Sequence, residues 1–257
     1  MTAGPGDARR WASENAFGPD DVACAIGGDG TIHEVVNGLM GRADSARPTL
    51  GVIPGGTGNA LMRDMGVRDP LVGMDRIVSD RPRLVDLMKV DHADGVSYAF
   101  NIVGYGLIAT GNATAEKLRV LGKRRYDAAG LLGIARRPVF HGELTIDDEP
   151  ILSRSLMVVF SNTKHCGEGM LMAPKASLND GLMDVVYVGD VGRLALLRLF
   201  AGLGKGDHVN SPDVGYVQAR AACLDASGDH NLNINNKLKG RAPFRVAMLP
   251  GALKILA

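Results

Sequence analysis

The chain has 257 residues and a formal net charge of +1, with 46% hydrophobic and 22% charged residues. This composition is typical of a folded globular protein with room for one large or two modest domains. A charge near zero excludes general attraction to nucleic acid, so no nucleic-acid partner is expected. The three cysteines, Cys24, Cys166 and Cys223, show no metal or disulfide spacing, which predicts reduced thiols in a cytoplasmic protein. No apolar run approaches the ~20 residues of a membrane span.

The first part of the chain alternates strand and helix patterns. In chain order we expect a helix at 7–17, a buried strand at 21–28, a helix at 30–40, a strand at 49–56, and helices at 57–67 and 69–80. A strand that runs into glycines and then into a helix occurs twice. This repetition predicts a layered α/β domain.

Beyond about residue 83 the pattern becomes rich in strands. We expect a hairpin at 83–106, helices at 112–137 broken near Gly122, strands at 142–151, 154–163 and 182–190, a helix at 192–206, and strands at 215–227, 232–237 and 243–256. The predicted fold class is therefore α/β. A Rossmann-like three-layer domain covers 1–85 and a β-sandwich domain covers 86–257, with the boundary near 82–92. The segment 243–257 is a candidate to return to the first domain.

Two glycine-rich loops each follow a predicted strand. They read GGDGT (27–31) and PGGTGNA (54–60), and each carries one hydroxyl residue, Thr31 or Thr57. Free backbone N–H groups at the start of a helix bind phosphate, and glycine lets the backbone approach the anion closely. No Gly-Lys-Ser/Thr follows either loop, and neither is a clean GxGxxG, so a P-loop and a dinucleotide fold are disfavoured. Two loops in tandem favour nucleotide binding over two simple tight turns.

Asp29 is unexpected between these glycines because a carboxylate repels bound phosphate. It fits if it accepts a proton from an incoming hydroxyl, or if it holds a Mg²⁺ ion that bridges phosphates. The alternative is an ordinary cap on the following helix. Glu34, Asn37 and Asn59 are further polar candidates near the loops.

The sequences GGDGTIHEVVNGLM and GVIPGGTGNALMRDMG resemble the diacylglycerol kinase catalytic family of lipid kinases. Within it, HEVVNGLM and GNAL are most similar to the sphingosine and ceramide kinase branch. GYGLIATGNATAEKLRVLGKRRYD and APKASLNDGLMDVVYV resemble later segments of that branch. The resemblance extends over roughly 20–257. It implies ATP and Mg²⁺ as cofactors, and transfer of the γ-phosphoryl group to a hydroxyl of a sphingoid base, ceramide or diacylglycerol.

The resemblance also implies a role for individual residues, with Asp29 as the catalytic base. The residues expected to bind the nucleotide are Gly27, Gly28, Gly30, Thr31, Glu34, Gly55, Gly56, Thr57, Gly58, Asn59, Arg119 and Arg125. The lipid is expected to contact Thr110, Ile108 and Phe100 in the second domain. Further candidates for the tail are Ile102, Leu107, Leu131, Leu132, Met170, Leu171 and Met172, although core packing is favoured over tail contact for any single one.

The segment 116–137 carries seven Lys or Arg against two acids. It is either a solvated helix face, a phosphate clamp or a surface for an anionic membrane. We therefore expect a lipid substrate and peripheral membrane contact as partners. The sequence leaves a homodimer open.

Three departures from the family pattern matter. No Asn-Pro-x-x-Gly turn precedes Gly27, so the first βα unit, which would support an adenine pocket, is expected to be missing. Thr110 stands where sphingosine kinases carry the Asp that binds the amine. Asn235, Asn236 and Lys237 replace an Asp-Gly-Glu, and Asp229 is the nearest substitute acid.

These departures keep a second hypothesis open, a catalytically inactive relative or truncated gene product that binds lipid or nucleotide. A third, an NAD kinase, shares GGDGT but neither HEVVNGLM nor the Asp-Gly-Leu-x-Asp strand. The metal ligands cannot be assigned from the sequence.

Overall fold

The computed structural model describes residues 2–18, 20–44, 47–56, 58–79, 81–167, 169–227 and 231–257, without the side chains of residues 119, 121 and 123. The helices are α1 (Asp7–Glu14), α2 (Asp29–Met40), α3 (Ala60–Asp64), α4 (Pro70–Val78), α5 (Leu107–Lys117), α6 (Arg125–Arg136) and α7 (Arg193–Gly202), with 3₁₀ turns η1 (Arg119–Arg124) and η2 (Asp207–Asn210). The strands are β1 (Val22–Gly27), β2 (Thr49–Pro54), β3 (Arg83–His92), β4 (Gly95–Ala99), β5 (Ile102–Gly106), β6 (Phe140–Ile146), β7 (Glu149–Ser161), β8 (Met183–Gly189), β9 (Val214–Ala219), β10 (Ala221–Ala226), β11 (Asn231–Ile234), β12 (Lys237–Arg241) and β13 (Phe244–Leu256).

The first domain is built around the parallel pair β1 and β2, which α2 connects. The apolar face expected for 30–40 is buried: Ile32, Val35, Val36 and Leu39 all belong to the core of this domain. Helix α4 packs on β2, where a Cβ on Gly73 would lie 3.1 Å from the Val52 carbonyl. The two strands therefore deliver both glycine loops to the same edge of the sheet.

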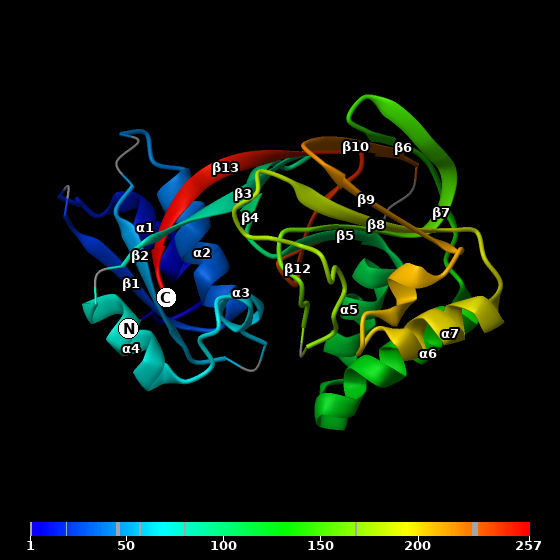
Figure 1. The fold of residues 1–257 in the computed structure, drawn as a ribbon, viewed down its shortest axis with the longest axis horizontal. Helices are drawn as coiled ribbons and strands as arrows, with labels where there is room; N and C mark the ends of the chain where they lie inside the picture. The colour runs from blue at the N-terminus through cyan, green and yellow to red at the C-terminus, as the bar shows by residue number, and fades with distance from the viewer. Residues whose placement is uncertain are drawn as a thin grey trace.

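Strand β13 connects the two domains, and Figure 1 shows it crossing between them in red. Its first half pairs antiparallel with β10 of the second domain, and β3 accompanies it across the junction. Its last residues, Ile255 and Leu256, pair in parallel with Leu50 and Gly51 of β2. The two domains thus share one curled sheet, which limits how freely they can move against each other.

The second domain is a strongly curved antiparallel sheet with helices α5, α6 and α7 gathered on one side (Figure 1). The expected break in the helical segment is present, because Gly122 has non-helical angles of φ 56° and ψ −131° within η1. One apolar core lies among the strands, and a smaller one around Ile134, Leu156, Leu196 and Leu199 joins the helices to the sheet. Within the residue ranges given above, no helix is long and apolar enough to cross a membrane.

Candidate active site between the glycine loops and an apolar cavity

The two glycine loops lie back to back at the carboxyl ends of β1 and β2. Gly27 pairs with Pro54 in the parallel register, and the Gly55 N–H donates to the Gly27 carbonyl at 2.9 Å. A Cβ built on Gly56 would lie only 2.5 Å from the Cα of Gly28, so a side chain at position 56 would force the loops apart. The loops therefore form one continuous backbone surface, at the strand edge where open α/β sheets bind ligands.

The side chain of Asn59 holds the second loop in shape. Asn59 has a left-handed φ of 46°. Its Oδ1 accepts from the Gly56 N–H at 3.2 Å, and its Nδ2 donates to the Gly56 carbonyl at 2.6 Å. Gly58 follows the loop, while Thr57 lies outside the described residues. Asn59 thus shapes the backbone of the predicted nucleotide site.

The first loop continues directly into α2. The carbonyl of Gly28, the N-cap residue, accepts from the N–H groups of Thr31 at 3.0 Å and Ile32 at 3.2 Å. The amides that precede Thr31 in the helix have no acceptor one turn back, as at every helix start. Those of Asp29 and Gly30 are therefore suited to an anion, with the positive end of the helix dipole behind them.

Asp29 joins the two loops through its side chain. The carboxylate is 8% exposed, and its Oδ1 accepts from the Ala60 N–H, the first residue of α3, at 3.0 Å. Asp29 therefore caps the helix of the other loop and not its own helix. Burial raises the pKa of Asp29, while the Ala60 N–H and the charge of Arg63 oppose that rise. A buried carboxylate with a raised pKa is a better proton acceptor than an exposed one.

Glu34 is held by a cation from the second domain. Its Oε1 accepts from the Lys237 Nζ at 2.6 Å, and its Oε2 accepts from the Gly6 N–H at 3.0 Å. Burial raises the pKa of Glu34, but the hydrogen bond and charge of Lys237 outweigh that effect and lower it overall. Lys237 also passes the first loop, because its Cε lies 3.7 Å from a Cβ built on Gly30. The carboxylate predicted to bind nucleotide is thus paired within the protein.

The Asn235–Asn236 pair forms the turn between β11 and β12. Both residues have positive φ, 49° and 65°, as the two central residues of a tight hairpin turn require. Asn235 is 1% exposed; its Oδ1 accepts from the Asn101 N–H at 3.0 Å, and its Nδ2 lies 3.0 Å from the His33 Nδ1. Asparagine keeps the turn that Asp-Gly would form, but it removes the acid. Asp229 lies outside the described residues.

The two arginines expected at the phosphates lie on the helical segment of the second domain. Arg119 falls in η1, and its side chain is not described. Arg125 opens α6, donates to the Tyr126 hydroxyl at 3.0 Å, stacks 4.8 Å above the Tyr126 ring, and lies 3.9 Å from Glu116. These contacts stay within the segment and do not reach the glycine loops.

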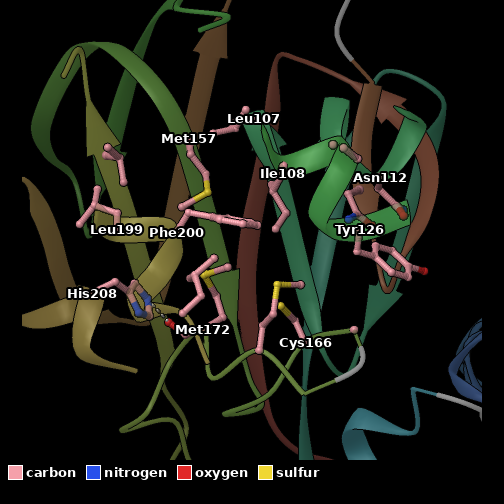
Figure 2. A pocket seen from close by; sticks show the side chains of 18 of the residues that line it. Leu107, Ile108, Asn112, Tyr126, Met157, Cys166, Met172, Leu199, Phe200 and His208 are labelled. Carbon is pink, nitrogen blue, oxygen red and sulfur yellow. Dashed lines mark hydrogen bonds between the residues drawn. The ribbon is translucent and has the colours of Figure 1, made fainter. Parts of the chain in front are cut away.

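An apolar cavity of about 150 Å³ lies between the sheet and helices α5, α6 and α7 (Figure 2). Of the residues expected to meet a lipid tail, those that line it are Ile102, Leu107, Ile108, Met170 and Met172. Phe100 is fully buried in the core of the first domain, and Leu131 and Leu132 are 51% and 41% exposed. The cavity is therefore apolar, lies inside the second domain, and is lined by part of the predicted set.

Polar groups line the same cavity, and sequence patterns pointed only to Asn236 among them. They are Asn112 on α5, Asp127 on α6, Asn233 on β11 and Asn236 in the turn. Thr110 does not line the cavity; its hydroxyl bonds to the Gly106 and Leu107 carbonyls of its own helix at 3.2 Å. Asn112 lies two residues beyond Thr110, so a search of the remaining polar positions of α5 would have found it.

The loop after β7 brings the cavity next to Asp29. Cys166 and Gly167 line the cavity, and the Gly167 carbonyl lies 3.5 Å from a Cβ built on Gly58. That same position is 2.8 Å from the Asp29 Oδ2. The loop is fixed to α3, because the His165 Nδ1 lies 2.5 Å from the Oδ1 of Asp64. A chain lying in the cavity would therefore emerge beside the buried carboxylate.

Comparisons with known proteins agree with this arrangement. Residues 1–90 match the diacylglycerol kinase catalytic domain, and residues 101–257 match the YegS C-terminal NAD kinase beta sandwich-like domain. The chain is 30% identical to a diacylglycerol kinase of Bacillus subtilis (93% of this chain, 78% of that protein) and 27% identical to sphingosine kinase 1 of Arabidopsis thaliana (80% and 52%). The chain belongs to the diacylglycerol kinase family of lipid kinases.

Solved structures show the same architecture. A diacylglycerol kinase from Bacillus anthracis superimposes with a TM-score of 0.78 at 24% identity, over 99% of this chain and 83% of that one. An NAD kinase from Archaeoglobus fulgidus in complex with ATP gives a TM-score of 0.51 at 11% identity, over 92% and 78%. The predicted α/β domain followed by a β-sandwich is confirmed, and at these identities the structural likeness concerns the fold alone.

Proposed function

We propose that this lipid kinase transfers the γ-phosphoryl group of ATP to a hydroxyl of a long-chain lipid, with Asp29 as the base. The observation that carries the proposal is the position of Asp29. It is buried, bonded to the Ala60 N–H, and lies next to the loop that closes the apolar cavity. One carboxylate thus meets both glycine loops and the place where a lipid chain would emerge. Sphingoid base, ceramide and diacylglycerol all carry a suitable hydroxyl.

In the proposed reaction the lipid oxygen attacks the γ-phosphorus, its proton passes to the Asp29 carboxylate, and the bond to the β-phosphate oxygen breaks to release ADP. The amides of Asp29 and Gly30 at the start of α2 would hold phosphate oxygens in place. The fold of the second loop, fixed by Asn59, would keep the phosphates aligned with the attacking oxygen. Asp64 and His165 would hold the loop at the cavity mouth.

Few protein ligands would hold a Mg²⁺ ion at this site. Among the described residues no three acidic, histidine or cysteine side chains cluster around one point. Magnesium in phosphoryl-transfer sites is usually held by one or two carboxylates together with substrate phosphates and water. Glu34 is paired with Lys237 and Asp29 is assigned as the base, so phosphate oxygens and water would supply most of the ligands of the ion. When bound, the ion would neutralise charge on the phosphates.

The test is transfer of ³²P from labelled ATP to a panel of lipids, resolved by thin-layer chromatography. We expect a labelled lipid product with the natural chain, and a loss of about 10²- to 10⁴-fold with Asp29→Asn. Asparagine can still accept from the Ala60 N–H, so thermal unfolding should change little. Turnover by a folded Asp29→Asn variant at the natural rate would refute the assigned role.

A second candidate function is binding of lipid and nucleotide without turnover. The observation that favours it is the ammonium of Lys237, which pairs with Glu34 at the place where the family pattern carries an acid. Calorimetric binding of ATP and lipid by the natural chain, combined with no transfer of label to any lipid, would establish this alternative. Label that appears on NAD would instead point to an NAD kinase.

We further propose that the chain contacts membranes peripherally through the segment η1–α6. Val120, near the N-terminal end of this segment, is 93% exposed, and Leu131 on α6 is 51% exposed. Exposed apolar side chains among basic residues are typical of surfaces that bind anionic bilayers. Co-sedimentation with vesicles containing phosphatidylserine, compared for the natural chain and Val120→Asp, tests this contact.

A further inference from the structure

Apart from His208, the polar side chains that line the apolar cavity come from α5, α6 and the β11–β12 hairpin. Figure 2 shows Asn112 and Tyr126 together there, while Leu199, Phe200 and His208 lie on the opposite side. The Nδ2 of Asn112 donates to the carbonyl of Asn236 at 2.9 Å. This side therefore adjoins the turn that leads to Lys237, whose side chain reaches the first glycine loop.

Two amide oxygens and a carboxylate at this end are hydrogen-bond acceptors, and the Tyr126 hydroxyl beside them accepts from Arg125. A carbonyl oxygen can only accept, so the bond to Asn236 fixes the Asn112 amide with its nitrogen toward the turn. The Asn112 Oδ1 therefore points away from the turn, and among the described residues it has no hydrogen-bond donor. Asn233 is 2% exposed, and its Oδ1 has no hydrogen-bond partner in the same part of the chain. Buried polar atoms are normally paired, so the Asn233 Oδ1 calls for a donor, and the Asn112 Oδ1, which is not fully buried, is free to accept one as well.

Asp127 adds a negative charge to these two acceptors. It lies in the first turn of α6, is exposed, and lines the cavity. Within the described residues its carboxylate forms no ion pair and no hydrogen bond. The neighbouring guanidinium of Arg125 stacks on Tyr126 and lies near Glu116. An unpaired carboxylate at the rim of an apolar cavity favours a cation or a donor-rich group.

We propose that Asp127, Asn112 and Asn233 form a subsite for the ammonium group of a long-chain amino alcohol, such as a sphingoid base. This inference rests on the proposed lipid kinase function and names its substrate class. An ammonium group supplies three donors and no acceptor, which matches three acceptors. The ester groups of diacylglycerol supply acceptors only. They would leave the Oδ1 atoms of Asn112 and Asn233 without a donor and place an ester oxygen next to the Asp127 carboxylate. Asp127 thereby takes the role of the acid that Thr110 replaces.

The experiment compares three lipids of equal chain length: sphinganine, N-acetylsphinganine and diacylglycerol. Binding of fluorescent analogues and kcat/KM for ³²P transfer are both measured for the natural chain and for Asp127→Asn. We expect sphinganine to bind best, and Asp127→Asn to weaken it by about tenfold to 100-fold, the range for a hydrogen bond to a charged group. The variant should leave the two uncharged lipids nearly unchanged. Asp213→Asn removes the same charge from an exposed position that does not line the cavity, so it should affect none of the lipids.

The two measurements separate the subsite from the reaction. Preferred binding of sphinganine that depends on Asp127, without label transfer, supports the subsite and rejects the kinase proposal for this chain. Transfer to diacylglycerol at a rate equal to or above that for sphinganine overturns the subsite and leaves the kinase proposal intact. An unchanged preference in Asp127→Asn, with folding verified by thermal unfolding, also overturns it.

Discussion

Replacing Gly56 by alanine tests whether contact between the two glycine loops creates the nucleotide site. A Cβ on Gly56 would lie 2.5 Å from the Cα of Gly28 and 3.1 Å from its nitrogen, and ordinary contact begins at 3.4 Å. These two Gly28 atoms are backbone, and the remaining neighbour is the Asn59 Oδ1 at 3.0 Å, so one loop must move by about 0.9 Å. The chain cannot relieve this contact by rotating a side chain. The variant should therefore separate the loops while β1 and β2 stay paired.

The expected effect on function is larger than that on stability. A misplacement of about 1 Å in a phosphate-positioning element lowers the reaction rate about 10²-fold. Overpacking costs about 1–3 kcal/mol, a fall of several degrees in Tm for a chain of this size. Titration calorimetry should show ATP affinity weakened about 100-fold by Gly56→Ala. Gly204→Ala is the matched control, because a Cβ there meets nothing within 4 Å.

Natural ATP affinity in a folded Gly56→Ala variant would refute this reasoning, because the loops would then not need to touch. If Gly204→Ala lost affinity equally, the effect could not be assigned to the loop contact. Unfolding of Gly56→Ala at room temperature would show that the contact supports the fold as much as the site.

Two further predictions concern pH and a buried pair. Burial, with the charges of Lys237 and Lys239, lowers the pKa of His33 from its ordinary 6.5 to about 4. As the pH falls, the unfolded chain therefore binds a proton at this histidine before the folded chain does. The stability contributed by neutral His33 is complete above pH 6.5 and is lost progressively down to about pH 4. The total loss is at most about 3 kcal/mol. His33→Gln should flatten urea unfolding free energies measured across this window, and an equal slope in the variant would show that other groups cause it. The Tyr216 hydroxyl donates to the fully buried Asp184 at 2.5 Å, so Tyr216→Phe should cost about 1–3 kcal/mol in urea unfolding. An unchanged unfolding free energy would mean that this bond contributes nothing.

Local signals in the sequence determined much of this protein. The glycine loops, the helix that begins at Asp29, and the break at Gly122 are encoded by residues within a few positions of one another. Hydrophobic periodicity predicted the core face of α2 correctly. Apolar side chains at helical spacing lie on one face of the helix, and that face packs against the buried core. The strand predicted at 232–237 was wrong in part, because Asn235 and Asn236 adopt the positive φ of a two-residue hairpin turn that ends β11 and starts β12.

Only the tertiary structure decided which polar groups meet. Lys237 reaches Glu34 across 203 positions of sequence, and Asp29 caps α3 across 31. No local sequence pattern predicts such pairs, because they depend on how β13 and the curled sheet bring the two domains together. The same reason explains Asp127 and Asn112, which lie on two helices and meet at one cavity. Sequence fixes the inventory of acceptors and donors, while the packing of sheet and helices determines which of them remain unpaired for a ligand.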